Sequence, residues 1–239
     1  MSFDLICDYL LSPVFIRGAM MTLLVTVTSL FFGILSGLLL ALLQGARFAA
    51  PRVLVLVYLW LFRGTPVLFQ IIFIYNVLPG FGIRLSAFVS ATIALSLNEG
   101  AYMSEIIRSG LGAVKQGQRT AGLALGMTRA GVMRHIVLPQ ALRVILPPMG
   151  NQMIGMLKTS ALVSVVAVQE LLLAANQTAA ANFRYFEALT AAGIYYLLLT
   201  TLFMIVQAWM ERALDPKRKR RGKARRPLID RFIPSAEAR

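Results

Sequence analysis

The feature that most restricts the fold of this chain is a series of five apolar stretches, each close to the length that a lipid bilayer requires. They occupy residues 20–43, 53–78, 87–107, 141–168 and 188–210. About 20 apolar residues in a helix cross the hydrocarbon core of a bilayer. Charged residues make up only 14% of the chain, whereas soluble domains hold about a quarter. The sequence therefore predicts an all-α integral membrane protein with about five transmembrane helices.

The distribution of lysine and arginine predicts the orientation of these spans. Basic residues are frequent in the first and third loops and at the C-terminal end, whereas the opposite face carries only Arg17, Arg84 and Arg184. Cytoplasmic loops carry an excess of Lys and Arg. We therefore expect the N-terminus outside the cell membrane and the C-terminus in the cytoplasm.

This orientation divides the chain into three parts. Residues 1–17 form an extracytoplasmic segment, residues 18–214 the transmembrane domain, and residues 215–239 a basic cytoplasmic tail for which we expect little order. Its basic run, Lys217 to Arg226, contributes most of the net charge of +14. Next to a final span, such a tail more often fixes topology and contacts anionic lipid than binds nucleic acid.

Polar residues inside the spans are candidates for function, because they are costly in lipid. Glu99 lies in the third stretch, and Asn151, Gln152 and Lys158 lie in the fourth. Two interpretations stay open: these residues hold helices together, or they line a path for a polar solute. Isolated charges favour the path for Glu99 and Lys158. Glu99 could also pair with Lys158 or with Arg63.

The second stretch is interrupted by the sequence Arg63-Gly64-Thr65-Pro66. Proline removes a backbone donor and clashes with the preceding helical turn, and transporters use interrupted helices at substrate sites. Arg63 is therefore a further candidate for the path. Alternatively, the membrane helix begins near Pro66 and Arg63 extends its charged end to the cytoplasmic interface.

The loop between the third and fourth stretches, residues 115–139, has the pattern of two short helices. Residues 118–125 form the first, and Gly126 provides the residue type favoured after a helix C-terminus. Thr128 is a good N-cap for a second helix over residues 129–137, which Leu138-Pro139 would stop. The pattern imitates a DNA-binding helix-turn-helix, but membrane spans close on both sides exclude entry into a major groove.

This segment resembles the cytoplasmic signature of permease subunits of bacterial ATP-binding-cassette importers, which reads Glu-Ala-Ala, three residues, Gly, nine residues, Ile, one residue, Leu-Pro. Ala121, Gly126, Ile136, Leu138 and Pro139 match it, whereas Thr120 and Gly122 replace the Glu and the second Ala. Further segments resemble the polar amino-acid branch of these permeases: residues 62–66, 100–108, 138–143 and 157–162.

The resemblance implies that residues 115–139 form a coupling-helix pair that docks on a separate ATPase subunit. The docking residues would be Thr120, Ala121, Gly122, Gly126, Ile136, Leu138 and Pro139, with Thr120 acting as a helix cap in place of the acid. The implied partners are that ATPase, a second permease subunit, identical or related, and an extracytoplasmic solute-binding protein. The implied cargo is a polar amino acid or a similar small solute.

We expect no catalytic residue, metal or cofactor in this chain. A phosphate loop requires a glycine five residues before Gly-Lys, and Lys217 stands there before Gly222-Lys223. Cys7 is the only cysteine and His135 the only histidine, which leaves no pair for a disulfide or a zinc site. An alternative function from another class is a membrane scaffold or signalling subunit that recruits a cytosolic partner and moves no solute.

Overall fold

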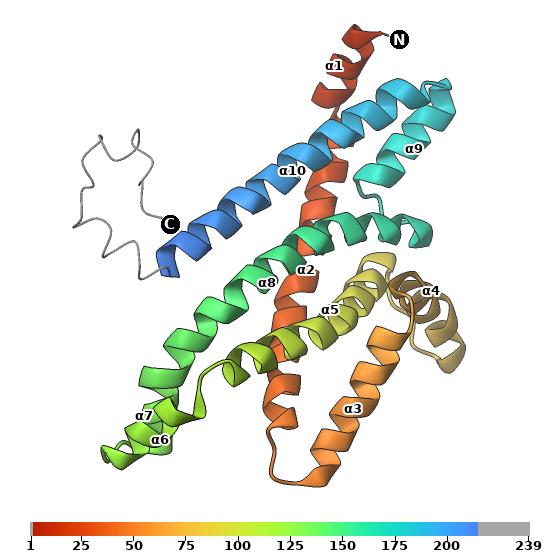
Figure 1. The fold of residues 1–239 in the computed structure, drawn as a ribbon. Helices are drawn as coiled ribbons and strands as arrows, with labels where there is room; N and C mark the ends of the chain where they lie inside the picture. The colour runs from red at the N-terminus through yellow and green to blue at the C-terminus, as the bar shows by residue number, and fades with distance from the viewer. Residues whose placement is uncertain (1, 215–239) are drawn as a thin grey trace, which may run out of the picture.

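The computed structural model describes residues 2–214, and within them all regular structure is helical (Figure 1). The α-helices are α1 (Phe3–Leu11), α2 (Pro13–Gln44), α3 (Ala49–Gly64), α4 (Val67–Val77), α5 (Ala87–Gly112), α6 (Gln116–Ala124), α7 (Arg129–Val132), α8 (Leu138–Thr159), α9 (Leu171–Asn182) and α10 (Tyr185–Leu214). Two 3₁₀ segments, η1 (Leu78–Phe81) and η3 (Ser160–Val166), and a π-helical segment, η2 (Met133–Val137), complete them. The tail predicted for residues 215–239 lies outside the described residues.

Two helices, α2 and α10, are long and apolar enough to cross a membrane as single elements. Two bent pairs meet the same criteria together: α3 with α4, bent by 102°, and the helix from Arg129 to Val166 with α9, bent by 52°. The all-helical membrane class is therefore confirmed, with two to four candidate spans. The predicted number of five also counts α5, whose interior carries Asn98, Glu99 and Glu105.

Helices α2 and α5 approach each other closely because small residues face one another across the contact. A β-carbon added at Gly37 would lie 2.5 Å from the Cβ of Met103 and 3.0 Å from the backbone nitrogen of Ser104. A β-carbon added at Gly100 would collide with Ser36. Membrane helices are held together by such close contacts, since lipid provides no hydrophobic drive for association.

Helix α9 was not predicted, and a buried glutamate fixes its first turn. Glu170 is fully buried, and its carboxylate accepts hydrogen bonds from the backbone N–H groups of Leu172 and Leu173 at 2.8 and 2.7 Å. The hydroxyls of Thr22 on α2 and Tyr196 on α10 donate to the same side chain at 3.4 and 2.9 Å. Glu170 therefore ties α9 to two membrane-spanning helices.

The corner formed by α6 and α7 lies at the end of the molecule away from the N-terminus (Figure 1). Helix α5 leads into this corner, and α8 leads away from it. This arrangement puts the predicted coupling segment at one end of the helix bundle.

Candidate functional site

The break between α3 and α4 leaves a backbone carbonyl without its helical partner. The carbonyl of Phe62 would accept from residue 66 in a continuous helix, but Pro66 has no N–H group. The side-chain amides of Gln70 and Asn98 donate to this carbonyl instead, both at 2.9 Å. The amide of Asn98 also donates to Gln70 at 3.2 Å, which connects the break to α5. The predicted interruption of the second span is therefore present in the structure, and side chains supply the hydrogen bonds that the Phe62 carbonyl loses there.

An open cavity of about 620 Å³ lies beside this break, between α3, α4, α5 and α8. Its lining consists of Arg63, Gly64, Thr65, Pro66, Val67, Leu95, Asn98, Glu99, Tyr102, Gln152, Gly155, Met156 and Thr159. Charged, amide and hydroxyl side chains thus share the wall with apolar ones. A cavity of this size and polarity can hold a small solute that carries charge.

The cavity brings together three of the five residues predicted for the solute path: Arg63, Glu99 and Gln152. Glu99 is only 5% exposed, and its Oε1 atom has no hydrogen-bond partner among the described residues. An unpaired polar atom in a buried position is costly. Glu99 therefore lacks the partners that a purely structural role would supply.

The other two predicted residues lie outside the cavity lining. Asn151 is exposed and accepts a hydrogen bond from Gln207 on α10 at 3.3 Å. Lys158 is exposed on α8. Both residues stay predictions for the path. The polar residues of the cavity lining that the prediction did not select are Thr65, Asn98, Tyr102 and Thr159. A helical face shared by Asn98 and Tyr102 on α5 was the signal that could have identified two of them.

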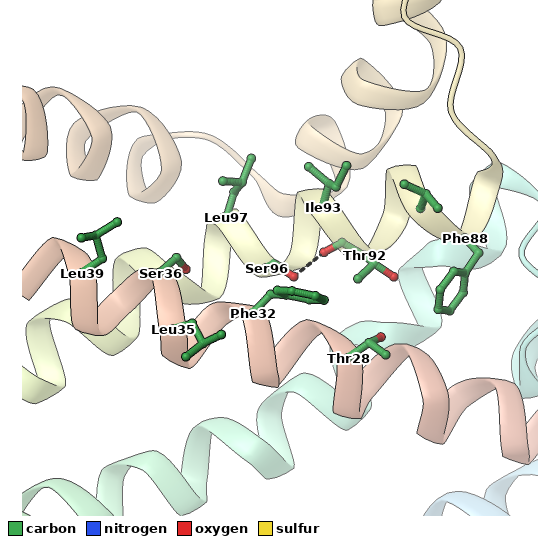
Figure 2. Close-up of a pocket in the computed structure, with 11 residues that line it drawn as sticks. Thr28, Phe32, Leu35, Ser36, Leu39, Phe88, Thr92, Ile93, Ser96 and Leu97 are labelled. Atoms are coloured by element: carbon green, nitrogen blue, oxygen red, sulfur yellow. Dashed lines mark hydrogen bonds between the residues drawn. The ribbon is translucent and has the colours of Figure 1, made fainter.

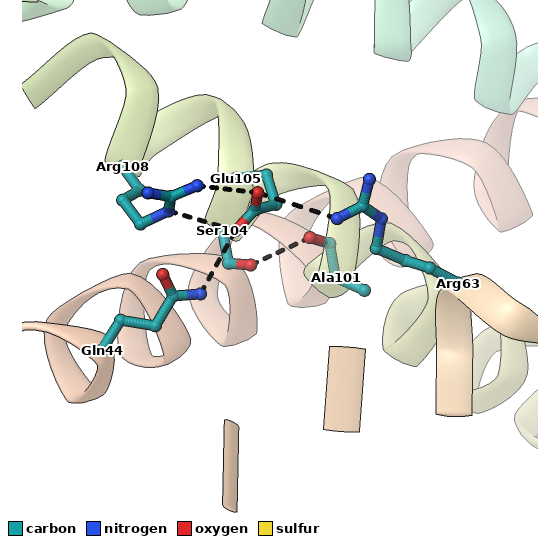
Figure 3. A network of polar contacts seen from close by, with 6 residues as sticks. All are labelled: Gln44, Arg63, Ala101, Ser104, Glu105 and Arg108. Atoms are coloured by element: carbon teal, nitrogen blue, oxygen red, sulfur yellow. Dashed lines mark hydrogen bonds and ion pairs between the residues drawn. The ribbon is translucent and has the colours of Figure 1, made fainter. Parts of the chain in front are cut away.

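Among the described residues, Glu99 forms no ion pair with Arg63 or with Lys158, and Arg63 pairs instead with Glu105 at 3.7 Å (Figure 3). Arg108 contacts the same carboxylate through Nη2 at 3.0 Å and Nε at 3.2 Å, and Gln44 donates to it at 3.4 Å. The guanidinium of Arg63 also lies 5.7 Å from the ring centre of Tyr102. The pairing of Arg63 with Glu99 that the sequence left open is therefore absent from the structure, in which Glu105 is the carboxylate within ion-pair distance of Arg63.

A second hollow, between α2 and α5, is almost entirely apolar. It has a volume of about 610 Å³, and its lining includes Phe32, Leu35 and Leu39 of α2 and Ile93 and Leu97 of α5. Figure 2 labels these residues. The hydroxyl of Ser96 is used within its own helix, where it donates to the carbonyl of Thr92 at 2.6 Å. This groove offers no charged group for the recognition of a polar solute.

The corner after α6 has the geometry predicted for Gly126. The N–H of Met127 donates to the carbonyl of Gly122 at 3.1 Å, and Gly126 takes a φ of +81°. This is the Schellman arrangement, in which the residue after the helix adopts the left-handed conformation that glycine tolerates best. Thr128 then accepts from the N–H of Gly131 at 3.1 Å, as expected for an N-cap.

Leu138 and Pro139 do not stop the second helix, contrary to the prediction. Residues 133–137 form a π-helical turn, and Leu138 donates its N–H to the carbonyl of Met133. The chain then continues directly into α8 with Pro139 in its first turn. Proline is tolerated there because the first N–H groups of a helix need no helical acceptor.

Thr120 is not a helix cap, because it lies inside α6 and its hydroxyl donates to the carbonyl of Gln116 at 3.2 Å. The N-cap position of α6 is Lys115, whose side chain makes no capping bond. Gly122 is buried at the point where α6 meets Val132 and Ile136. A β-carbon there would lie 2.7 Å from Cδ1 of Ile136 and 2.9 Å from Cγ2 of Val132.

The corner also presents an apolar tip to its surroundings. Leu125 is 84% exposed, and Ala121 beside it is exposed as well. A hydrogen bond of 2.5 Å from Gln140 to Gln118 joins α8 to α6 behind this tip. Exposed apolar side chains on a rigid corner fit a partner-binding surface. Among residues 2–214, no cluster of three or more His, Cys, Asp or Glu side chains could hold a metal ion.

Comparison with known proteins identifies the family of this chain. The family model described as a binding-protein-dependent transport system inner membrane component matches residues 33–216. The glutamine transport system permease protein GlnP of Escherichia coli K12 is 36% identical over 216 residues, which cover 90% of this chain and 99% of the relative. The arginine transport system permease protein ArtQ of Bacillus subtilis is 36% identical over 203 residues, which cover 84% and 93%.

Solved structures give the same result for the fold. The crystal structure of an amino acid ABC transporter with histidines matches with a TM-score of 0.82 and 38% sequence identity, over 89% of this chain and 100% of that chain. The MetNI methionine ABC transporter matches with a TM-score of 0.73 at 20% identity, over 90% and 100%. At that lower identity the likeness concerns the fold alone.

Proposed function

The chain belongs to the family of binding-protein-dependent transport system inner membrane components, as the transmembrane permease of an importer whose ATPase is a separate subunit, and from this premise we propose a route for its solute. The route passes through the cavity beside the α3–α4 break. Glu99 carries the proposal, because it is a buried carboxylate that lines the cavity without a partner for its Oε1 atom among the described residues.

The cargo is a polar amino acid. Relatives at 36% and 37% identity are named as permeases for glutamine, arginine and L-cystine. The cavity of this chain supplies a carboxylate from Glu99, a guanidinium from Arg63 and an amide from Gln152. An α-amino acid carries an ammonium and a carboxylate, and these groups are complementary to Glu99 and Arg63. Asn151 and Lys158 stay candidates for parts of the path that two permease subunits would share.

The proposed topology has five spans, formed by α2, the α3–α4 pair, α5, α8 and α10. The N-terminus lies outside and the C-terminus in the cytoplasm, in agreement with the distribution of arginine and lysine. The α6–α7 corner then lies on the cytoplasmic side between the third and fourth spans, where a cytosolic ATPase can reach it.

The α6–α7 corner is the docking surface for the ATPase subunit. Its exposed Leu125 forms an apolar tip, and the exposed Arg129 and Arg134 give it a positive rim. Gly126 shapes the corner, while Gly122 and Ile136 pack its two helices together. Because the corner is rigid, motion of the ATPase is transmitted to α5 and α8 and is not absorbed by a flexible loop. The complete importer would also include a second permease, identical or related, and a solute-binding protein.

Reconstitution tests the proposed function directly. The permease and its ATPase are placed in lipid vesicles with the solute-binding protein, and ATP turnover is measured across a panel of amino acids. We expect polar amino acids to stimulate turnover and to accumulate in the vesicle interior. An assembled complex that no amino acid stimulates would instead support the scaffold or signalling role.

A further inference from the structure

The solute cavity adjoins a second cavity, and the two share part of their walls. The second has a volume of about 730 Å³ and lies towards the C-terminal ends of α2 and α5. Arg63, Gly64 and Tyr102 line both cavities, whereas Gln44, Glu105 and Arg108 line only the second. Any solute that moved from one cavity to the other would therefore pass Arg63 and Tyr102.

Arg63 is held at this boundary by two weak contacts. Its guanidinium lies 3.7 Å from the carboxylate of Glu105 and 5.7 Å from the ring centre of Tyr102. The Arg63 side chain remains 44% exposed. An exposed ion pair of this kind changes the equilibrium constant between its paired and unpaired states by no more than about fivefold. A carboxylate in the solute cavity can therefore compete for Arg63.

Glu105 does not depend on Arg63 for its charge partner (Figure 3). Arg108 donates two hydrogen bonds to the Glu105 carboxylate, at 3.0 and 3.2 Å, and Gln44 donates a third at 3.4 Å. A carboxylate that accepts a forked guanidinium pair is well satisfied. Departure of Arg63 would thus leave Glu105 paired.

The backbone next to Arg63 is held by hydrogen bonds, whereas open space lies beside its side chain. The carbonyl of Phe62, the preceding residue, accepts from both Gln70 and Asn98 at 2.9 Å. Next to it, an added β-carbon at Gly64 would meet no atom within 4 Å, so the space beside Arg63 is open. A change of rotamer at Arg63 is therefore enough to alter the boundary, without a movement of α3.

We propose that Arg63 is an exchangeable latch between the two cavities. Without solute, it pairs with Glu105 and closes the boundary together with Tyr102. The carboxylate of an amino acid in the first cavity takes Arg63 from Glu105, and the boundary opens toward the second cavity. A ligand shifts such an equilibrium only through different affinities for the two states, and the carboxylate supplies that difference. The inference rests on the proposed function.

Direct binding tests the latch without the solute-binding protein, whose own affinity would otherwise set the apparent constant. Radiolabelled L-glutamine and L-arginine are titrated onto the permease–ATPase complex in lipid nanodiscs, and their α-carboxamides are used as competitors. Arg63→Gln should weaken binding of the amino acids by about tenfold or more, as expected for a lost charge-assisted bond. It should leave binding of the carboxamides unchanged, since these lack the carboxylate.

Glu105→Gln should act in the opposite direction and strengthen amino-acid binding by up to about fivefold, because the competitor for Arg63 is removed. In the double variant this gain should disappear, so that the two substitutions are not additive. Arg52→Gln is the matched control, because Arg52 lies on the same helix and its Nε donates to the backbone carbonyl of Phe48. Arg52→Gln should bind as the original chain does.

The binding results test the latch, and the turnover of the complete importer tests the proposed function. Additive effects of Arg63→Gln and Glu105→Gln, or an equal loss for amino acids and carboxamides, would overturn the latch while transport itself stands. Absence of amino-acid binding to the unaltered complex would overturn the latch too. Absence of stimulated ATP turnover in the complete importer would count against the proposed function as well.

Discussion

At the scale of single residues, Glu99 is in a position that stability alone does not explain. A buried carboxylate without a full set of partners lowers the free energy of unfolding by several kcal/mol, and the neutral amide of glutamine avoids most of this cost. Glu99→Gln should therefore leave folding and ATPase co-purification intact or slightly improved. Uptake of amino acids into reconstituted vesicles should fall by about tenfold or more, because the solute ammonium loses its charged partner.

Glu211→Gln is the control for this substitution, since Glu211 lies on α10 and lines neither of the two polar cavities. It should transport as the original chain does. An unchanged uptake rate and affinity in Glu99→Gln would assign Glu99 to helix packing. A loss of assembly in this variant would have the same meaning.

Gly126 is the residue on which the shape of the corner depends. Its φ of +81° lies in the left-handed region, which costs a residue with a side chain roughly 1–2 kcal/mol. Gly126→Leu should reduce both ATPase co-purification and uptake. Gly117→Leu is the matched change in the same segment, because an added β-carbon at Gly117 would meet no atom within 4 Å. Equal co-purification of both variants would contradict docking at the corner.

Several residue positions were predictable because they follow from backbone chemistry that is local in sequence. Gly126 and the N-cap Thr128 are of this kind, and both have the predicted geometry. Partners that come from distant helices were not predictable. Nothing in the sequence near Arg63 indicated that Glu105, rather than Glu99, lies next to it, because the helix crossing that decides this is a tertiary property.

At the scale of elements, α9 shows how a short helix was missed. Its length of 12 residues is below that of a membrane span, and its alanine-rich sequence has no marked apolar face. The only local signal was Glu170, which caps it. The burial of Glu170 against α2 and α10 could not be seen in the sequence, because Thr22 lies 148 positions away.

Glu170→Ala should destabilise the permease more than an ordinary loss of a cap. The substitution removes the acceptor for two backbone N–H groups and for the hydroxyls of Thr22 and Tyr196. A lost cap costs about 0.5–2 kcal/mol, and the Tyr196 hydroxyl left without its acceptor adds about 1–3 kcal/mol. The Thr22 hydroxyl keeps an acceptor in the carbonyl of Gly18 at 3.1 Å. The unfolding temperature of the purified complex that contains Glu170→Ala should be well below that of the complex with the original chain.

Glu170→Gln distinguishes a hydrogen-bonding role from other effects of the substitution. Glutamine keeps one acceptor oxygen and should recover part of the thermal stability. A control at Glu211, changed to Ala, should shift the unfolding temperature little. Equal unfolding temperatures for Glu170→Ala and the original chain would show that α9 is not anchored through this side chain.

At the scale of the whole molecule, the membrane class and the helical architecture were predictable, because a bilayer permits few other structures. The number of spans was harder to predict. Helices α3 and α4 meet at 102°, so one apolar stretch of the sequence becomes two elements in different directions. Hydropathy along the chain indicates the length and polarity of a span, but it does not predict the angle between α3 and α4 at Pro66.

The orientation of the whole molecule is testable through Cys7, the only cysteine of the chain, which is exposed. A maleimide that does not cross membranes should label Cys7 in cells whose inner membrane is intact, because the proposed topology puts the N-terminus outside. In a Cys7→Ser background, Leu125→Cys should be labelled only after the membrane is opened, because the corner lies in the cytoplasm. The exposure of Leu125, at 84%, ensures that a failure to label reflects the membrane rather than burial. Labelling of Leu125→Cys in intact cells would reverse the proposed topology and remove the corner from the reach of a cytosolic ATPase.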